Sequence, residues 1–272
     1  MNESSKVLII IGCSRSGTSF TASWLHSMGL NLGENLIGPS EINLKGHFED
    51  IEILRLHNKI LKSNNTDYSV GLNKKIDIPE IYFEEAKEIY SLRSSKNKQW
   101  GWKEPRTCLF LKMWDQIIYD AYFLVVFRDF RQVVDSHIKM KKTKSNSINF
   151  FLSKLLGLFK FYFFGISKAD KFLASWIRNN QDIITFYENS INKEEFIFCN
   201  VESILHKNEK IYTTLTDGWG FKLAFENPNG IFEKKLMHLK PENYNFDGKL
   251  ENIANNIFDK LNSLSLKVEF HN

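Results

Sequence analysis

An apolar run that leads directly into a glycine-rich turn limits most strongly what this chain can fold into. Residues 6–11 (KVLIII) contain no alternation of polar and apolar side chains after Lys6, and Gly12 and Gly17 bracket the turn that follows. A strand of this kind must be covered on both faces, which is typical of the parallel sheet of an α/β protein. The turn predicts a tight passage into a helix that begins at Thr18, where exposed backbone N–H groups favour an anion.

The rest of the chain alternates between strand and helix patterns. Further buried strands are predicted at 99–103, 121–127 and 195–199. Helices are predicted at 18–28, 51–61, 79–92, 109–115, 130–140, 169–189 and 250–264. No repeat and no low-complexity linker divides the chain, so residues 1–272 are expected to form a single domain. Its expected fold is α/β, with a P-loop-type doubly wound parallel sheet flanked by helices.

Charge and cysteine content exclude several classes of function. The net charge of +4 is small, and a nucleic-acid-binding domain would be more basic, so no nucleic-acid partner is expected. Cys13, Cys108 and Cys199 are widely spaced and odd in number, which fits neither a disulfide framework nor a metal site and favours a reducing compartment. The first apolar run lacks the features of a signal peptide. We therefore expect a cytoplasmic protein that holds no metal.

The turn after the first strand has the spacing of a P-loop. A nucleoside triphosphatase has Lys directly after the second glycine, whereas this chain has Thr18 there and carries its cation at Arg15. The loop instead resembles the segment of sulfotransferases that binds the 5′-phosphosulfate of their donor. The residues that match are Arg15, Ser16, Gly17, Thr18 and Ser19. A small-molecule or nucleoside kinase and a non-catalytic nucleotide-binding module remain as alternatives.

Two further segments extend this resemblance. Arg128 ends a predicted strand and Ser136 follows eight residues later, as do the Arg and Ser that bind the donor's 3′-phosphate in sulfotransferases. Phe130 stands where many relatives have Pro, which affects the start of a helix rather than the chemistry. Residues 100–106 (WGWKEPR) resemble the W-x-x-K-x-P-R segment of bacterial and Golgi-like sulfotransferases. The resemblance covers residues 7–140 well and the C-terminal part more weakly.

The resemblance implies a reaction and roles for particular residues. A sulfonate group would pass in line from 3′-phosphoadenosine 5′-phosphosulfate (PAPS) to a hydroxyl or amine, without a metal. Arg15 and Lys103 would stabilise the charge that develops, although Lys103 could instead pair with Glu104 or Asp50. The segment 41–50 resembles the acidic segment that supplies the base in carbohydrate sulfotransferases. Glu49 is our first candidate for that base, followed by His47 and Glu41.

The sequence allows more than one role for residues 49–50 and for the stretch 148–166. Glu49 and Asp50 could merely cap the helix that is predicted to begin at residue 51. The aromatic stretch 148–166 contains Lys154 and Lys160, each of which would cost about 2.5–3.5 kcal/mol in a membrane, so it is not expected to span one. It could form a lid over the cleft, or residues 139–166 could make peripheral membrane contact. We expect the acceptor to be a carbohydrate or glycolipid.

Overall fold

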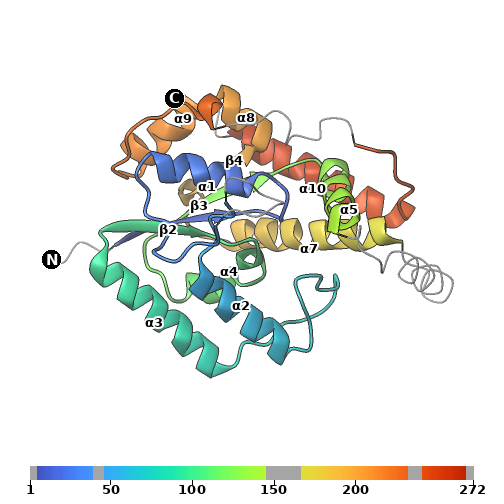
Figure 1. The fold of residues 1–272 in the computed structure, drawn as a ribbon, viewed down its shortest axis with the longest axis horizontal. Helices are drawn as coiled ribbons and strands as arrows, with labels where there is room; N and C mark the ends of the chain where they lie inside the picture. Colours follow the sequence, from blue (N-terminus) through green and yellow to red (C-terminus); the bar gives the residue numbers. More distant parts are fainter. Residues whose placement is uncertain (1–4, 39–45, 145–166, 232–240, 268–272) are drawn as a thin grey trace.

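One parallel sheet organises the part of the chain that the computed structural model describes, which is residues 5–38, 46–144, 167–231 and 241–267. Its four strands have the order β2-β1-β3-β4 (Figure 1). They are β1 (Lys6–Ile11), β2 (Gln99–Lys103), β3 (Ala121–Phe127) and β4 (Phe196–Asn200). In the register of the sheet, Ile9 of β1 lies opposite Trp102 on one side and Phe123 on the other. The predicted α/β fold with a parallel sheet is confirmed.

The sheet has a hydrophobic core on each face. Ile9 and Ile11 of β1 contribute to one core and Leu8 and Ile10 to the other, and all four are fully buried. Successive side chains of a strand point to opposite faces, so a strand between two cores has no polar position, which explains the uninterrupted apolar run.

Helices cover both faces of the sheet, as Figure 1 shows. One face is covered by α1 (Thr18–Ser27), α8 (Val201–His206) and α9 (Asn208–Thr213). The other is covered by α2 (Ile51–Ser63), α4 (Leu111–Asp115), α5 (Phe130–Lys144), α7 (Lys168–Asn189) and α10 (Gly248–Lys267). Helix α3 (Glu80–Lys96) lies outside these layers, against α2 and the edge strand β2.

The predicted helices are present, with ends that shift by a few residues. The helix predicted at 109–115 begins two residues later, as α4, and a 3₁₀ turn, Pro105–Leu109, precedes it. Helices α8 and α9 and the π-helical turn Thr214–Gly218 were not predicted from the sequence. Helices of five or six residues are too short to show a 3.6-residue period, and these are held by burial of Ile204, Ile211 and Leu215.

Helix lengths and apolarity also bear on the membrane question. Within the described residues, no helix is both long enough and apolar enough to cross a membrane. The stretch 148–166, for which we predicted a lid or a membrane-interface segment, lies outside the described residues.

Candidate active site

The glycine turn connects β1 to α1 at the carboxyl end of the sheet. Gly17 is the residue before the helix and has the left-handed φ of 95°. A Cβ atom at this position would lie 2.3 Å from a methyl group of Val201, so no other residue fits. Arg15 also has a left-handed φ, of 71°, which is uncommon for a residue with a side chain. The N–H of Ser16 closes the turn on the carbonyl of Cys13 at 3.1 Å.

The side chains of this turn are mostly buried, and one of them lacks a partner. Ser16 and Thr18 are 0% and 3% exposed. The Ser16 hydroxyl forms no hydrogen bond within the described part of the chain. A buried hydroxyl without a partner is costly, so one beside backbone N–H groups at a helix start indicates a place for a ligand oxygen.

Strand β3 and helix α5 bring the second predicted segment to the same turn. Arg128 follows β3 and is 4% exposed, and its carbonyl accepts a 3.2 Å hydrogen bond from the Trp176 indole. Its Nε donates to Gln132 at 2.6 Å, whereas its Nη2 has no partner among the described residues. Ser136, two helical turns later, accepts a 2.9 Å hydrogen bond from Nε of Arg15. The three residues predicted from two separate motifs therefore meet: Arg15, Arg128 and Ser136.

Electrostatics at this meeting point favour an anion. Burial lowers the pKa of Arg15, and burial together with the charge of Arg15 lowers the pKa of Arg128. An arginine side chain stays charged in a protein despite such a shift. Two neighbouring guanidinium groups that repel one another, one buried and one partly buried, are stabilised by a ligand with several negative charges, such as a phosphate.

Two residues that the sequence did not single out, Tyr68 and His137, contact Ser14 of the glycine turn. The N–H of Ser14 donates a 3.0 Å hydrogen bond to the Tyr68 hydroxyl, and the Ser14 hydroxyl lies 3.0 Å from Nε2 of His137. The His137 ring stacks on Phe172 with centroids 4.8 Å apart. Tyr68 belongs to no motif, and neither does His137. Its position next to Ser136 was the one available signal.

Lys103 is the last residue of β2 and contacts Ser19 of α1. The Lys103 side chain is fully buried, and its ammonium donates to Glu49 at 3.0 Å and to Ser19 at 3.2 Å. Burial lowers the pKa of Lys103, and the negative charge of Glu49 opposes that effect. Glu49 keeps 15% of its side chain exposed. Among the described residues, Lys103 thus bonds to Glu49 and Ser19 rather than to Glu104 or Asp50.

Asp50 caps helix α2, and its neighbour Glu49 does not. Oδ1 of Asp50 accepts hydrogen bonds from the N–H groups of Glu52 and Ile53 at 3.0 and 3.1 Å. Phe48 has a left-handed φ of 52°, a strained conformation for a bulky residue, directly before Glu49. Among the other predicted bases, His47 lies on the same loop with its N–H bonded to Ile37, and Glu41 lies outside the described residues.

A buried polar network lies directly beyond Lys103. Glu104 is fully buried and accepts hydrogen bonds from His57 at 2.6 Å and from the backbone N–H of Arg106 at 3.0 Å. The Arg106 guanidinium also pairs with Glu104 and lies over the Tyr68 ring at 5.5 Å. Among the described residues, no three His, Cys, Asp or Glu side chains are grouped as metal ligands would be.

Comparisons with known proteins concern the fold. No protein-family model and no curated protein matches the chain. The sulfotransferase domain from the curacin biosynthetic pathway is similar with a TM-score of 0.52 at 12% identity, over 93% of this chain and 98% of that one. Sulfotransferase STF9 from Mycobacterium avium has a TM-score of 0.53 at 13% identity, over 94% of this chain and 76% of that one. This chain therefore has the fold of the sulfotransferases.

Proposed function

We propose that this protein is a sulfotransferase that transfers a sulfonate group from PAPS to a hydroxyl or amine. The observation that carries the proposal is the meeting of Arg15, Arg128 and Ser136 at the glycine turn. The Ser16 hydroxyl and Nη2 of Arg128 are buried there without partners among the described residues. These donors fit a nucleotide that carries phosphate groups on both its 3′ and 5′ positions.

The same residues weigh against an ATP-dependent kinase. A kinase of this loop type uses the Lys after the second glycine to reach the β- and γ-phosphates. Thr18 occupies that position and is 3% exposed. The cation of this turn is Arg15, which is tied to Ser136 on α5. This arrangement suits a donor with a phosphate on the 3′ side better than a triphosphate chain.

Sulfonate transfer then follows from the positions of four side chains. The acceptor oxygen or nitrogen attacks the sulfur of PAPS as the bond from sulfur to the bridging oxygen breaks. The electron pair of that bond stays on the bridging oxygen, which leaves as part of adenosine 3′,5′-bisphosphate. Arg15 and Lys103 stabilise the developing negative charge, and Ser19 orients Lys103. Glu49 takes the proton that the acceptor loses.

Glu49 has a suitable setting for this role. Its carboxylate is partly exposed, so an acceptor can approach it, and its 3.0 Å contact with Lys103 places base and cation side by side. When the donor's sulfonate binds beside Lys103, the ammonium can turn toward it from Glu49. The carboxylate is then able to accept the acceptor's proton.

The acceptor class that we propose is a carbohydrate or glycolipid hydroxyl. The segment that contains Glu49 resembles that of carbohydrate sulfotransferases. Pro105 stands where the cytosolic aryl-sulfating enzymes have a catalytic His, two residues after Lys103. A carboxylate base on this loop takes the place of that imidazole in the proposed mechanism.

Calorimetric titration with adenosine 3′,5′-bisphosphate in the absence of Mg²⁺ tests the donor site. We expect micromolar binding that weakens at least tenfold in Arg15→Ala and in Arg128→Ala, since a hydrogen bond from a charged group contributes about 1.5–3 kcal/mol. Arg131→Ala is the matched control, because Arg131 is 39% exposed and bonds to Glu251 of α10. If the protein binds ATP only with Mg²⁺ and does not bind the bisphosphate, the proposal is contradicted. That result would favour a kinase.

A further inference from the structure

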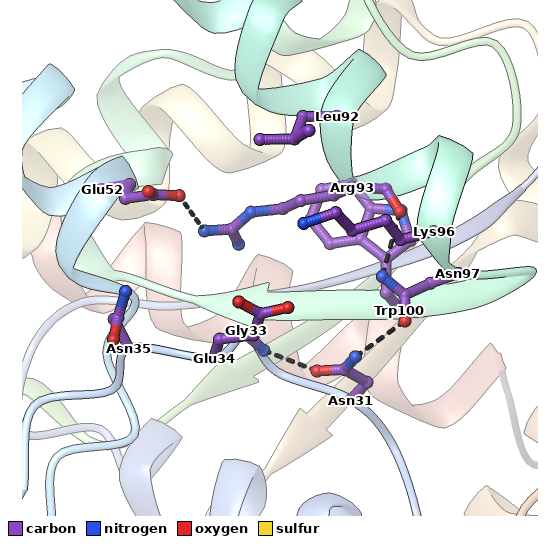
Figure 2. A pocket seen from close by; sticks show the side chains of 10 residues that line it. All are labelled: Asn31, Gly33, Glu34, Asn35, Glu52, Leu92, Arg93, Lys96, Asn97 and Trp100. Atoms are coloured by element: carbon purple, nitrogen blue, oxygen red, sulfur yellow. Dashed lines mark hydrogen bonds and ion pairs between the residues drawn. The ribbon is translucent and has the colours of Figure 1, made fainter.

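Arg93 reaches inward from helix α3, outside the layers that build the site. Its guanidinium is 12% exposed and pairs with the fully buried Asp50 and, at 2.7 Å, with Glu52. It also lies 5.5 Å from the centroid of the Trp100 ring. Burial alone would lower the pKa of Arg93, but the ion pairs with Asp50 and Glu52 raise it. Figure 2 shows this side chain extended across Trp100 toward Glu52.

The hollow beside Arg93 is structural rather than a binding site. Its volume is about 70 Å³, far below the roughly 300 Å³ or more of a small-molecule pocket. Polar groups close it: Asn31 donates to Asn97 at 2.9 Å, and Asn97 donates to the carbonyl of Arg93 at 3.0 Å (Figure 2). These bonds tie the loop after α1 to the end of α3. The backbone of Arg93 is thereby held in place, and its guanidinium is held by Asp50 and Glu52.

Asp50 links Arg93 to Glu49, the candidate base. One carboxylate oxygen caps α2, and the other pairs with Arg93. A Cβ atom on Gly33 would lie 2.3 Å from that second oxygen, so the backbone of the loop packs directly on it. The carbonyl of the preceding residue, Glu49, is fixed by the N–H of Ile37 at 2.8 Å. Asp50 and Glu49 share a peptide bond, so we expect a shift of Asp50 to change the backbone that directs the Glu49 side chain.

We infer that Arg93 is a positioning residue that holds Glu49 against Lys103 by neutralising Asp50. A buried carboxylate that loses its cation is destabilised by several kcal/mol, so Asp50 would move toward water without Arg93. Glu49 would then leave its 3.0 Å contact with Lys103. The inference rests on the proposed function for its effect on turnover, but the positioning itself is a property of the fold.

Turnover of PAPS with water as acceptor measures the effect without a known substrate. We expect Arg93→Met to lower kcat at least tenfold while the affinity for adenosine 3′,5′-bisphosphate stays within twofold, since Arg93 is remote from Arg15 and Arg128 in the network of contacts. Arg93→Lys should recover part of the loss, because an ammonium can still pair with Asp50. Glu52→Gln is the control and should leave kcat unchanged, since Glu52 is 47% exposed.

A double-mutant cycle separates positioning from general damage. In a Glu49→Gln background, Arg93→Met should cause no further loss of kcat, because its effect passes through Glu49. An equal loss in both backgrounds, or a parallel loss of bisphosphate affinity, would overturn the inference. If Arg93→Met does not fold, Arg93→Lys in the same two backgrounds provides the test.

Amine acetylation followed by mass spectrometry tests the geometry without turnover. Lys103 is fully buried and paired, so it should be protected in the wild-type protein and in Glu52→Gln. It should become reactive in Arg93→Met. Protection of Lys103 in Arg93→Met would contradict the positioning role, whether or not the protein binds the bisphosphate. The expected labelling without any bisphosphate binding would contradict only the proposed function.

Discussion

At the scale of single residues, the hydrogen bonds of His57 define its protonation. The indole N–H of Trp114 donates to Nε2 of His57 at 3.0 Å, so the ring proton is on Nδ1 and is donated to Glu104. Burial lowers the pKa of His57. Burial alone would raise the pKa of Glu104, but the bond from His57 and the charge of Arg106 lower it. Lys103 is thus followed by an ionised carboxylate that a neutral imidazole orients.

The state of His57 predicts how stability depends on pH. Because its pKa is lower in the folded protein than the usual 6.5, the unfolded chain binds more protons below that pH, and the free energy of unfolding falls as the pH falls. We expect a loss of about 1 kcal/mol between pH 7.5 and 5.5, measured by urea unfolding. His57→Asn can still donate to Glu104 but does not titrate, so its loss should be smaller. An equal loss in both proteins would contradict the assignment.

The candidate site residues that the sequence indicated belong to segments that resemble those of sulfotransferases. Arg128 comes directly after β3 and Arg15 lies in the turn after β1, and parallel strands place such residues at one edge of the sheet. Tyr68 lies in the segment 64–79 between α2 and α3, so nothing in the sequence indicated that it would contact Ser14. Which of Glu49 and Asp50 caps α2 needed the structure, since both residues of that acidic pair can cap a helix.

At the scale of elements, helix α1 has a left-handed glycine at each end. Gly17 precedes it with φ of 95°, and Gly29 follows it with φ of 100°. Only Gly17 is also crowded, because a Cβ atom there would meet Val201 of α8, whereas Gly29 has nothing within 4 Å. Both positions therefore need a residue that tolerates a left-handed backbone, but only Gly17 is packed against another element. The glycine turn is thus in contact with α8.

Replacing each glycine by alanine separates these two effects. Gly29→Ala should cost about 1–2 kcal/mol of unfolding free energy, the strain of a left-handed residue with a Cβ atom. Gly17→Ala should cost clearly more, and it should also weaken bisphosphate binding, because α8 must move away from the turn. Equal costs in chemical denaturation, or full binding by Gly17→Ala, would show that Val201 yields without disturbing the turn.

The elements themselves were largely predictable, and their arrangement was less so. Strands β1 and β3 are uniformly apolar runs because both of their faces are buried, which makes them easy to identify. The predicted strand at 195–199 became Phe196–Asn200, a shift of one residue. The order β2-β1-β3-β4 depends on packing across the whole chain, and no local pattern encodes it.

At the scale of the whole molecule, the proposed donor site joins parts that the chain keeps far apart. Arg15 lies in the turn after β1, whereas Arg128 follows β3 and Ser136 lies on α5, and the bond from Arg15 to Ser136 spans 121 positions. A ligand that contacts both segments stabilises only the folded arrangement. Its binding free energy is therefore added to the free energy of unfolding.

Thermal unfolding with ligands gives the last prediction. Adenosine 3′,5′-bisphosphate at 100 times its Kd should add about 2.7 kcal/mol of stability, which corresponds to a rise in Tm of roughly 5 °C for a chain of this size. The rise should be independent of Mg²⁺ and absent in Arg128→Ala, because that variant lacks the buried guanidinium whose Nη2 has no partner among the described residues. Arg131→Ala should keep it. A rise with ATP that needs Mg²⁺ and persists in Arg128→Ala would assign the glycine turn to a triphosphate, since only the 3′-phosphate requires Arg128.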